Sequence, residues 1–414
     1  MLATCLGCGC ACDVIQLRVE ENRIREARNA CALGLQWFGD GSVPSRVVIG
    51  GRDASVDDAL DVAADLLGQA ARPLVYLAPD ISCETQRVAI GLADALHATV
   101  DSVTTGTTRG AVLAAQEIGR ASATLGEIRN RADVVVFWGV DPTQRYPRFW
   151  TRYAPEPSGL HVAGRHGRIV LAVDVGSARG PEDADERMSV MSDREVSFLE
   201  ELTALAARAD SGATVPPVLG TILRGKYVAL IADAEPAIDG GDDDGRSAAL
   251  LTFAQALNGP TRCAYVALRA GGNRSGADAC LTAQTGYPIA VDFSRGHPRY
   301  RPHEHAAARL ERGHVDAVLV VGSAGLIPFP AARFASVPTI VIGPRATEAP
   351  FSTSAAVDTG VAGIHEAGTA LRMDEVPLPL GAAIDGPRRA VDVVADLARR
   401  VASATVARGA GNRQ

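Results

Sequence analysis

Hydrophobic residues follow two alternating patterns along most of the chain. Seven short apolar segments are typical of strands, and most lack polar alternation, as strands buried on both faces do: residues 74–78, 99–103, 133–138, 169–174, 227–232, 317–322 and 339–342. The stretches between them favour amphipathic helices at residues 55–70, 84–97, 193–209, 246–257 and 387–402. Ser55, with Asp58 three residues later, has the pattern of a helix N-cap. This alternation predicts an α/β fold with a parallel sheet covered by helices on both faces.

The chain has more predicted strands than one such sheet needs, so we expect two Rossmann-like lobes behind a small cap. The predicted boundaries are residues 1–48 for a Cys-rich cap, 49–130 plus 271–414 for one lobe, and 131–270 for a second, inserted lobe. We also expect loops at residues 104–109, 211–217 and 235–245, a helix starting at Gly110, and a disordered tail after Ala407.

Composition narrows the class of protein. The chain has 414 residues, of which 47% are hydrophobic and 21% charged, enough for a core that needs no disulfide or metal for size alone. A formal net charge of −7 argues against a nucleic-acid partner. We see no targeting segment and no apolar run of the ~20 residues that span a bilayer, and therefore expect a cytoplasmic protein without a membrane partner. Thiols stay reduced there, so the eight cysteines need an explanation other than disulfides.

Five of the eight cysteines lie within the first 31 residues. Four of them have gaps of two, three and eighteen residues: Cys5, Cys8, Cys12 and Cys31. Three close thiolates and a fourth returning from further along the chain suit a [4Fe–4S] cluster. A tetrahedral zinc site and no metal at all remain alternatives. No role is expected for Cys10, and the three later cysteines are interpreted as small core residues: Cys83, Cys263 and Cys280.

Other polar segments indicate a function less specifically than the cysteines do. A loop with His297, His303 and His305 also carries three arginines, which favours a phosphate or partner contact over a metal site. Residues 37–38 and 145–150 mix aromatics and arginine, which indicates either an interface or a seal between cap and sheet. We find no Gly-x-Ser-x-Gly elbow, HExxH or GxGxxG motif.

The cysteine spacing, followed by a long Rossmann-like chain, resembles the molybdopterin and tungstopterin oxidoreductases. Four stretches resemble the B subunit of formylmethanofuran dehydrogenase within that group: residues 124–133, 138–142, 284–296 and 368–374. The resemblance runs from residue 5 to about residue 380. It implies a molybdopterin-oxidoreductase-like fold, with cysteines 5, 8, 12 and 31 as iron–sulfur ligands.

Two departures from the family pattern bear on activity. The resemblance implies a metal-ligating cysteine or selenocysteine followed by His-Gly at a strand-to-helix turn, where this chain has Thr108 and Arg109. A threonine hydroxyl is a poor substitute for a soft thiolate. The family also usually has a lysine shortly after the fourth cysteine, where this chain has Leu33. We therefore expect no bound molybdopterin or tungstopterin and assign no catalytic or cofactor-binding residue.

The pattern resembles a related complex of methylotrophic bacteria, the formyltransferase/hydrolase complex, which does no redox chemistry. The resemblance implies a non-catalytic structural B subunit in formaldehyde oxidation. Its partners would be an amidohydrolase-like A subunit and the C and D subunits of the formyltransferase, which handle formyl groups between tetrahydromethanopterin, a methanofuran-type carrier and formate. The alternatives are a redox-active tungsten or molybdenum subunit and a small electron-transfer protein.

Overall fold

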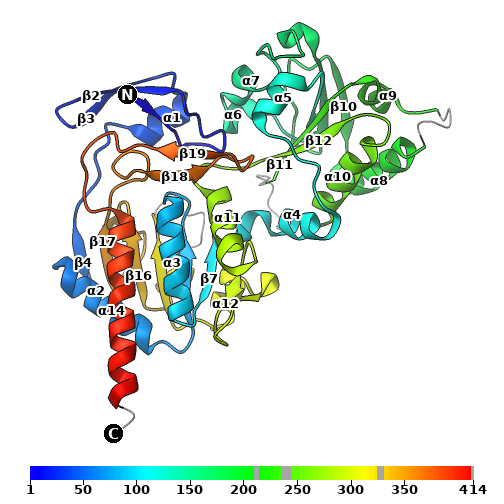
Figure 1. Cartoon of the computed structure of the whole chain (residues 1–414). Helices are drawn as coiled ribbons and strands as arrows, with labels where there is room; N and C mark the ends of the chain where they lie inside the picture. Colours follow the sequence, from blue (N-terminus) through cyan, green and yellow to red (C-terminus); the bar gives the residue numbers. More distant parts are fainter. Residues whose placement is uncertain (209–213, 235–243, 324–330, 412–414) are drawn as a thin grey trace.

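The strands form four sheets, two of them large and mostly parallel (Figure 1). The computed structural model describes residues 1–208, 214–234, 244–323 and 331–411. The prediction of an α/β fold with parallel sheets is confirmed. In Figure 1 the larger sheet and its helices lie below, the second sheet lies to the upper right, and the N-terminal segment lies above the larger sheet.

The nine-stranded sheet has the order β14-β13-β7-β6-β15-β16-β17-β4-β5. Its five central strands are parallel: β6 (Pro73–Leu77), β7 (Thr99–Ser102), β15 (Ala317–Val321), β16 (Thr339–Gly343) and β17 (Ala355–Asp358). Short antiparallel strands finish both edges: β13 (Val291–Asp292), β14 (Arg299–Tyr300), β4 (Val47–Ile49) and β5 (Arg52–Asp53). From β6 the chain adds its next strand, β7, on one side, and from β15 it adds β16 and β17 on the other side. The carboxyl ends of β6 and β15 therefore form the kind of crevice where α/β sheets bind ligands.

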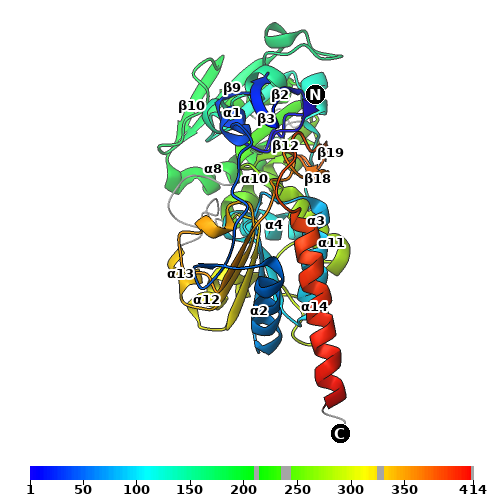
Figure 2. The ribbon, with the colours of Figure 1, turned by 90° about the vertical axis from the view of Figure 1, so that its left-hand side faces the viewer.

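Alternate residues of this sheet enter two different cores. Val75 and Leu77 pack in one with α2 (Val56–Gln69), α3 (Cys83–Ala95) and α14 (Ala390–Gly411). Leu74 and Tyr76 face the opposite core, which includes residues of α12 (Ala306–Glu311) and Phe334 of α13 (Ala331–Ala335). Figure 2 shows α2, α3 and α14 on one side of the sheet and α12 and α13 on the other. This two-sided burial explains why the strands read as continuous apolar runs.

The five-stranded sheet is entirely parallel, in the order β10-β9-β8-β11-β12. Its strands are β8 (Val134–Trp138), β9 (Ile169–Val175), β10 (Glu186–Val190), β11 (Val228–Asp233) and β12 (Cys263–Leu268). One face packs against α8 (Glu195–Ala206), α9 (Pro217–Arg224), α10 (Asp244–Leu257) and the end of α4 (Thr105–Ile118). The other face packs against α5 (Leu125–Arg131), α6 (Pro142–Arg145), α7 (Phe149–Arg152) and the N-terminal cysteine segment. We call this sheet and its helices the second lobe.

The first 40 residues form a small three-stranded sheet and a short helix. The elements are β1 (Leu2–Ala3), β2 (Ile15–Glu20), β3 (Arg23–Arg28) and α1 (Ala32–Phe38). A C-terminal hairpin of β18 (Gly368–Leu371) and β19 (Pro377–Leu380) packs on this segment through Leu6 and Ala11. The remaining elements are α11 (Arg274–Thr285) and the 3-10 turns Gly164–Gly167, Ser192–Arg194, Pro302–Glu304 and Ala346–Glu348.

The start of α2 follows its sequence signal, whereas the start of α4 and the end of α14 differ from the prediction. The Ser55 side chain accepts a hydrogen bond from the Asp58 amide, as its position before α2 predicts. The expected loop at residues 104–109 is wrong: α4 begins at Thr105, and Thr108 alone has non-helical angles (φ −133°, ψ 15°), which make a kink. The disordered tail expected after Ala407 is wrong for residues 408–411, which continue α14, and residues 412–414 lie outside the described residues. Of the loop expected at residues 211–217, residues 214–216 are described and lie in neither helix nor strand, and α9 begins at Pro217. The loop expected at residues 235–245 lies outside the described residues up to residue 243, and α10 begins at Asp244.

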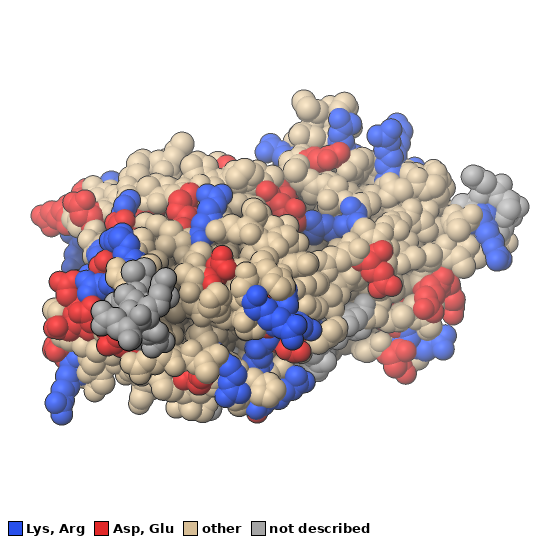
Figure 3. Space-filling model, turned by 60° about the horizontal axis from the view of Figure 1, so that its bottom comes forward, with Lys and Arg blue, Asp and Glu red and all other residues tan. Residues whose placement is uncertain are grey.

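Acidic and basic side chains are interspersed on the face shown in Figure 3, and neither sign forms a continuous field there. Among the described residues, no helix is both long enough and apolar enough to cross a bilayer.

Candidate metal centre

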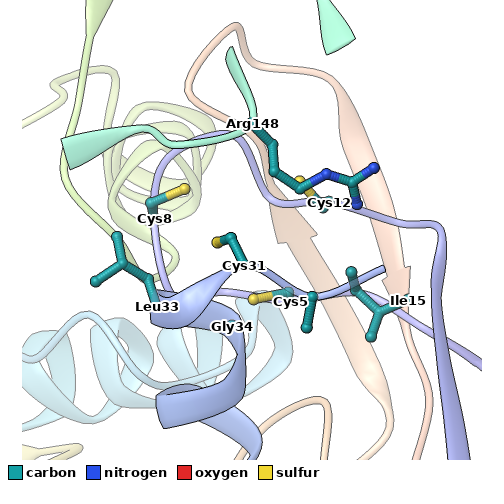
Figure 4. Close-up of a pocket in the computed structure, with 9 residues that line it drawn as sticks. Cys5, Cys8, Cys12, Ile15, Cys31, Leu33, Gly34 and Arg148 are labelled. Atoms are coloured by element: carbon teal, nitrogen blue, oxygen red, sulfur yellow. The ribbon is translucent and has the colours of Figure 1, made fainter. Parts of the chain in front are cut away.

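The four cysteines singled out by their spacing line one pocket (Figure 4). The pocket region has about 240 Å³ of space not filled by protein atoms, part of which is open to solvent. Its other lining residues are mostly apolar or small: Ile15, Ala30, Leu33, Gly34 and Arg148. Cys5, Cys8 and Cys12 come from the loop between β1 and β2, and Cys31 precedes α1. The folded chain thus brings together residues that are up to 26 positions apart in the sequence.

Local backbone structure puts the thiols on the same side of the loop. The Cys5 amide donates to the Cys12 carbonyl at 2.9 Å, which closes the loop, and Ala11 takes a left-handed conformation (φ 37°) at its turn. The Gly7 amide points at the Cys5 sulfur at 3.4 Å. On α1, a Cβ at Gly34 would lie 3.3 Å from that same sulfur, so a larger residue there would press on the pocket.

Burial favours the protonated form of the Cys5 and Cys12 thiols by raising the pKa of each. It raises the pKa of the Cys5 thiol to about 12. Burial also raises the pKa of Cys12, although the positive charges of Arg152 and Arg148 oppose this effect. Metals bind the thiolate form, so metal uptake would release protons and would be favoured by alkaline pH.

The donor chemistry fits a thiolate-ligated centre. Four thiols share one pocket whose walls offer no carboxylate or imidazole. Four thiolates are the usual ligands of a [4Fe–4S] cluster and one of the ligand sets of a structural zinc site. Within residues 1–208, 214–234, 244–323 and 331–411, no group of three or more His, Cys, Asp or Glu residues is already arranged so that it could hold a metal ion. The fit therefore rests on the identity and shared location of the four thiols.

The other four cysteines are buried outside this pocket. Cys10 has no exposed surface, and its carbonyl accepts a hydrogen bond from the Tyr153 hydroxyl at 3.4 Å. Cys83 and Cys280 are neighbours in the core between α3 and α11, where the Cys280 thiol lies 3.6 Å from the Cys83 carbonyl. Cys263 belongs to the core of the second lobe. The interpretation of the last three as core residues is confirmed.

The two departures from the family pattern have different surroundings. Thr108 is buried at the kink of α4, and its hydroxyl donates to the Thr104 carbonyl at 3.1 Å. Arg109 follows it in the same helix. Leu33 lies on α1 and places an apolar side chain on the wall of the cysteine pocket.

The aromatic and arginine segments seal the N-terminal segment against the second lobe. Trp37, Trp150 and Phe149 pack in the core that also contains the cysteines of the pocket. Arg148 and Arg152, from the same segment, were not predicted as part of the site. Their spacing of four residues puts both on one face of a helix, but the sequence does not say what that face meets.

In the histidine-rich loop, one of the three arginines is already paired with a carboxylate. Arg299 donates to the Asp292 carboxylate at 2.7 Å and to Ser294, and its side chain is only 18% exposed. His297 contacts the Arg295 carbonyl at 3.2 Å on the surface.

Asp80 is a buried carboxylate at the crevice between β6 and β15, which the sequence did not single out. Its Oδ1 accepts a hydrogen bond from the Ser323 amide at 2.7 Å, whereas its Oδ2 is buried without a hydrogen-bond partner among the described residues. Burial raises the pKa of Asp80 to about 6.

We expect Asp80 to make the stability of the chain depend on pH. The unfolded carboxyl ionises near pH 4 and the folded one near pH 6, so its contribution is fully present below about pH 4 and is lost as the pH rises through about 6. Asp80→Asn should therefore flatten the pH dependence of the free energy of unfolding across this window. Urea denaturation of both proteins at pH 4.5 and pH 7 checks this, and parallel profiles would contradict it.

Comparisons with known proteins give the following similarities. No family model matches the chain. The B subunit of the tungsten-containing formylmethanofuran dehydrogenase 2 of Methanococcus maripaludis is 30% identical over 92% of this chain and 93% of its own length. The protein of the same description from Methanocaldococcus jannaschii has the same identity and coverage. Among solved structures, the formyltransferase/hydrolase complex from Methylorubrum extorquens in complex with methylofuran contains a chain that matches with a TM-score of 0.72. That match is 23% identical and covers 87% of this chain and 99% of the other.

Proposed function

The chain belongs to the family of formylmethanofuran dehydrogenase B subunits, and on this premise we propose that it is a structural B subunit of a formyltransferase/hydrolase complex. Such a complex handles formyl groups between tetrahydromethanopterin, a methanofuran-type carrier and formate. Its partners would be an amidohydrolase-like A subunit and the C and D subunits of the formyltransferase, which would carry the chemistry. The similarity in fold to a chain of the solved complex supports this choice within the family.

Thr108 is the observation that carries the proposal. The family's redox subunits need a soft sulfur or selenium ligand for tungsten or molybdenum, and this chain offers a hydroxyl at that position. That hydroxyl is buried and already donates to the Thr104 carbonyl at 3.1 Å. A neutral alcohol held in a backbone hydrogen bond is a weak ligand for either metal, so we infer that the chain does not catalyse the redox step.

We further propose that Cys5, Cys8, Cys12 and Cys31 hold a metal centre with a structural role. A [4Fe–4S] cluster suits their spacing best, and zinc is the alternative. When bound, such a cluster could exchange single electrons. A redox-active tungsten or molybdenum subunit is therefore the second candidate. Leu33 argues against that candidate, because it puts an apolar side chain beside the pocket where the family usually has a lysine.

Elemental analysis tests both proposals together. The complex, purified anaerobically through a tag on this chain, should contain the A, C and D subunits. It should also contain about four irons per copy of this chain, with neither tungsten nor molybdenum. Stoichiometric tungsten or molybdenum would overturn the structural role, and purification without the other subunits would overturn membership of the complex. Finding zinc instead of iron would show that the four cysteines form a tetrathiolate zinc site and not an iron–sulfur cluster.

A further inference from the structure

Helix α7 of the second lobe faces the cysteine pocket with positive charge. Arg148, at the N-terminus of α7, lines the pocket, and Figure 4 shows its guanidinium beside Cys12. The same guanidinium donates a hydrogen bond to the Asn29 carbonyl, which lies two residues before Cys31. One arginine of the second lobe therefore contacts the site and the N-terminal segment that carries all four thiols.

Arg152 lies four residues further along α7 and also reaches this segment. It forms an ion pair with Asp13, the residue next to Cys12. Its side chain is only 16% exposed, and its Nη1 is buried without a hydrogen-bond acceptor among the described residues. A buried guanidinium N–H without a partner is costly, so this geometry leaves a donor for an anionic group near Cys12.

The surroundings hold Arg152 in place. Its guanidinium lies over the ring of Tyr153, 5.2 Å from the centroid, and Arg372 lies 5.4 Å from the same ring. Arg372 is itself paired with Asp374 at 2.6 Å and donates to the Tyr153 hydroxyl at 3.3 Å. The position of the charge is thus fixed before any metal binds, which lowers the entropic cost of using it.

We propose that Arg148 and Arg152 are positioning residues for the metal–thiolate centre, and that the centre, through them, fixes the N-terminal cysteine segment to the second lobe. This inference rests on the metal site proposed above. Four thiolates around a [4Fe–4S] core or around zinc carry roughly two net negative charges, and a buried anion of this kind needs nearby cations or donors. The four thiols come from the N-terminal segment and the two cations from α7, so binding links two parts of the chain.

Arginine variants test this on the full-length chain. The double variant R148Q/R152Q should lose bound iron or zinc to a chelator about 10- to 100-fold faster than the wild-type chain, as loss of supporting contacts to metal ligands does elsewhere. Metal should also no longer protect residues 14–31 from hydrogen exchange in this variant. R148K/R152K keeps the charges and should recover most of the retention. R131Q removes an exposed arginine of the same lobe, paired with Glu127 at 3.9 Å, and should behave as wild type.

The outcomes separate this inference from the proposed function. Metal loss from R148Q/R152Q within about twofold of the wild-type rate would overturn the role of the arginines and leave the cysteine site standing. A wild-type chain that takes up neither iron nor zinc would overturn both, while membership of the complex is judged separately by co-purification. If R148Q/R152Q does not fold, the two single variants give the same comparison, and their equality with R131Q would overturn the inference.

Discussion

Serine in place of Cys8 is expected to abolish metal binding by the chain, whereas alanine in place of Cys10 leaves it intact. The two residues share one loop and are both buried, but only Cys8 lines the pocket with the other three thiols. A serine hydroxyl does not ionise at neutral pH and is a hard donor, so it does not replace a thiolate toward iron or zinc. Cys10→Ala removes one buried sulfur and should cost about 1 kcal/mol of stability.

Metal content per chain after anaerobic purification distinguishes the two variants. We expect Cys8→Ser to contain no stoichiometric iron or zinc and to exchange amide hydrogens faster in β2 and β3, because metal binding energy stabilises a segment whose own core is small. The hydrolase activity of a complex that still assembles should not change. Wild-type metal content in Cys8→Ser, or its loss in Cys10→Ala, would show that the ligand set is different.

Replacing Arg168 by methionine should destabilise the second lobe by about 3–5 kcal/mol. Arg168 is 4% exposed, and its hydrogen bonds run to four backbone carbonyls. These belong to Arg129, Ala132, Pro155 and Pro157, so the guanidinium joins the end of α5 and the loop after α7 to the start of β9. Methionine fills similar volume but removes the donor from two buried and two partly buried carbonyl acceptors.

Urea denaturation followed by tryptophan fluorescence measures this effect, because Trp138 and Trp150 both lie in the second lobe. Arg129→Met is a matched control: its side chain bonds the Ser158 carbonyl at 3.3 Å near the surface, and the change should cost less than about 1 kcal/mol. Equal destabilisation by the two variants would contradict the role of the buried carbonyl cluster.

The hydrophobic pattern predicted seven strands of the two large sheets, whose faces are covered: β6, β7, β8, β9, β11, β15 and β16. It did not predict β12 or β17, although both are largely buried. It missed β10, whose residues are all partly or fully exposed at the sheet edge and so lack a continuous apolar run. It also missed the start of α4, since the run Thr105–Thr108 has poor helix propensity and becomes helical only around a kink. Local pattern therefore identifies many, but not all, of the strands that are buried on both faces, and it fails at the exposed edge strand β10 and at the kink of α4.

Some residues of the candidate site could be predicted from the sequence and others could not. The spacing of the four cysteines was enough to predict that they share one location. The sequence could not predict the roles of Arg148, Arg152 and Asp80, because each contacts residues far away in the sequence. The arginines contact the N-terminal cysteine segment, and Asp80 contacts Ser323.

The hairpin β18–β19 has a consequence for the order of events during synthesis. Thr4 donates a hydrogen bond to the Pro379 carbonyl at 2.8 Å, and the Met373 amide donates to the Gly9 carbonyl at 3.1 Å. The cysteine loop is therefore covered by residues that are synthesised much later than the loop itself. Until then a nascent chain carries these thiols on an incomplete support, so a metal bound by the four cysteines would enter after the hairpin β18–β19 has been made.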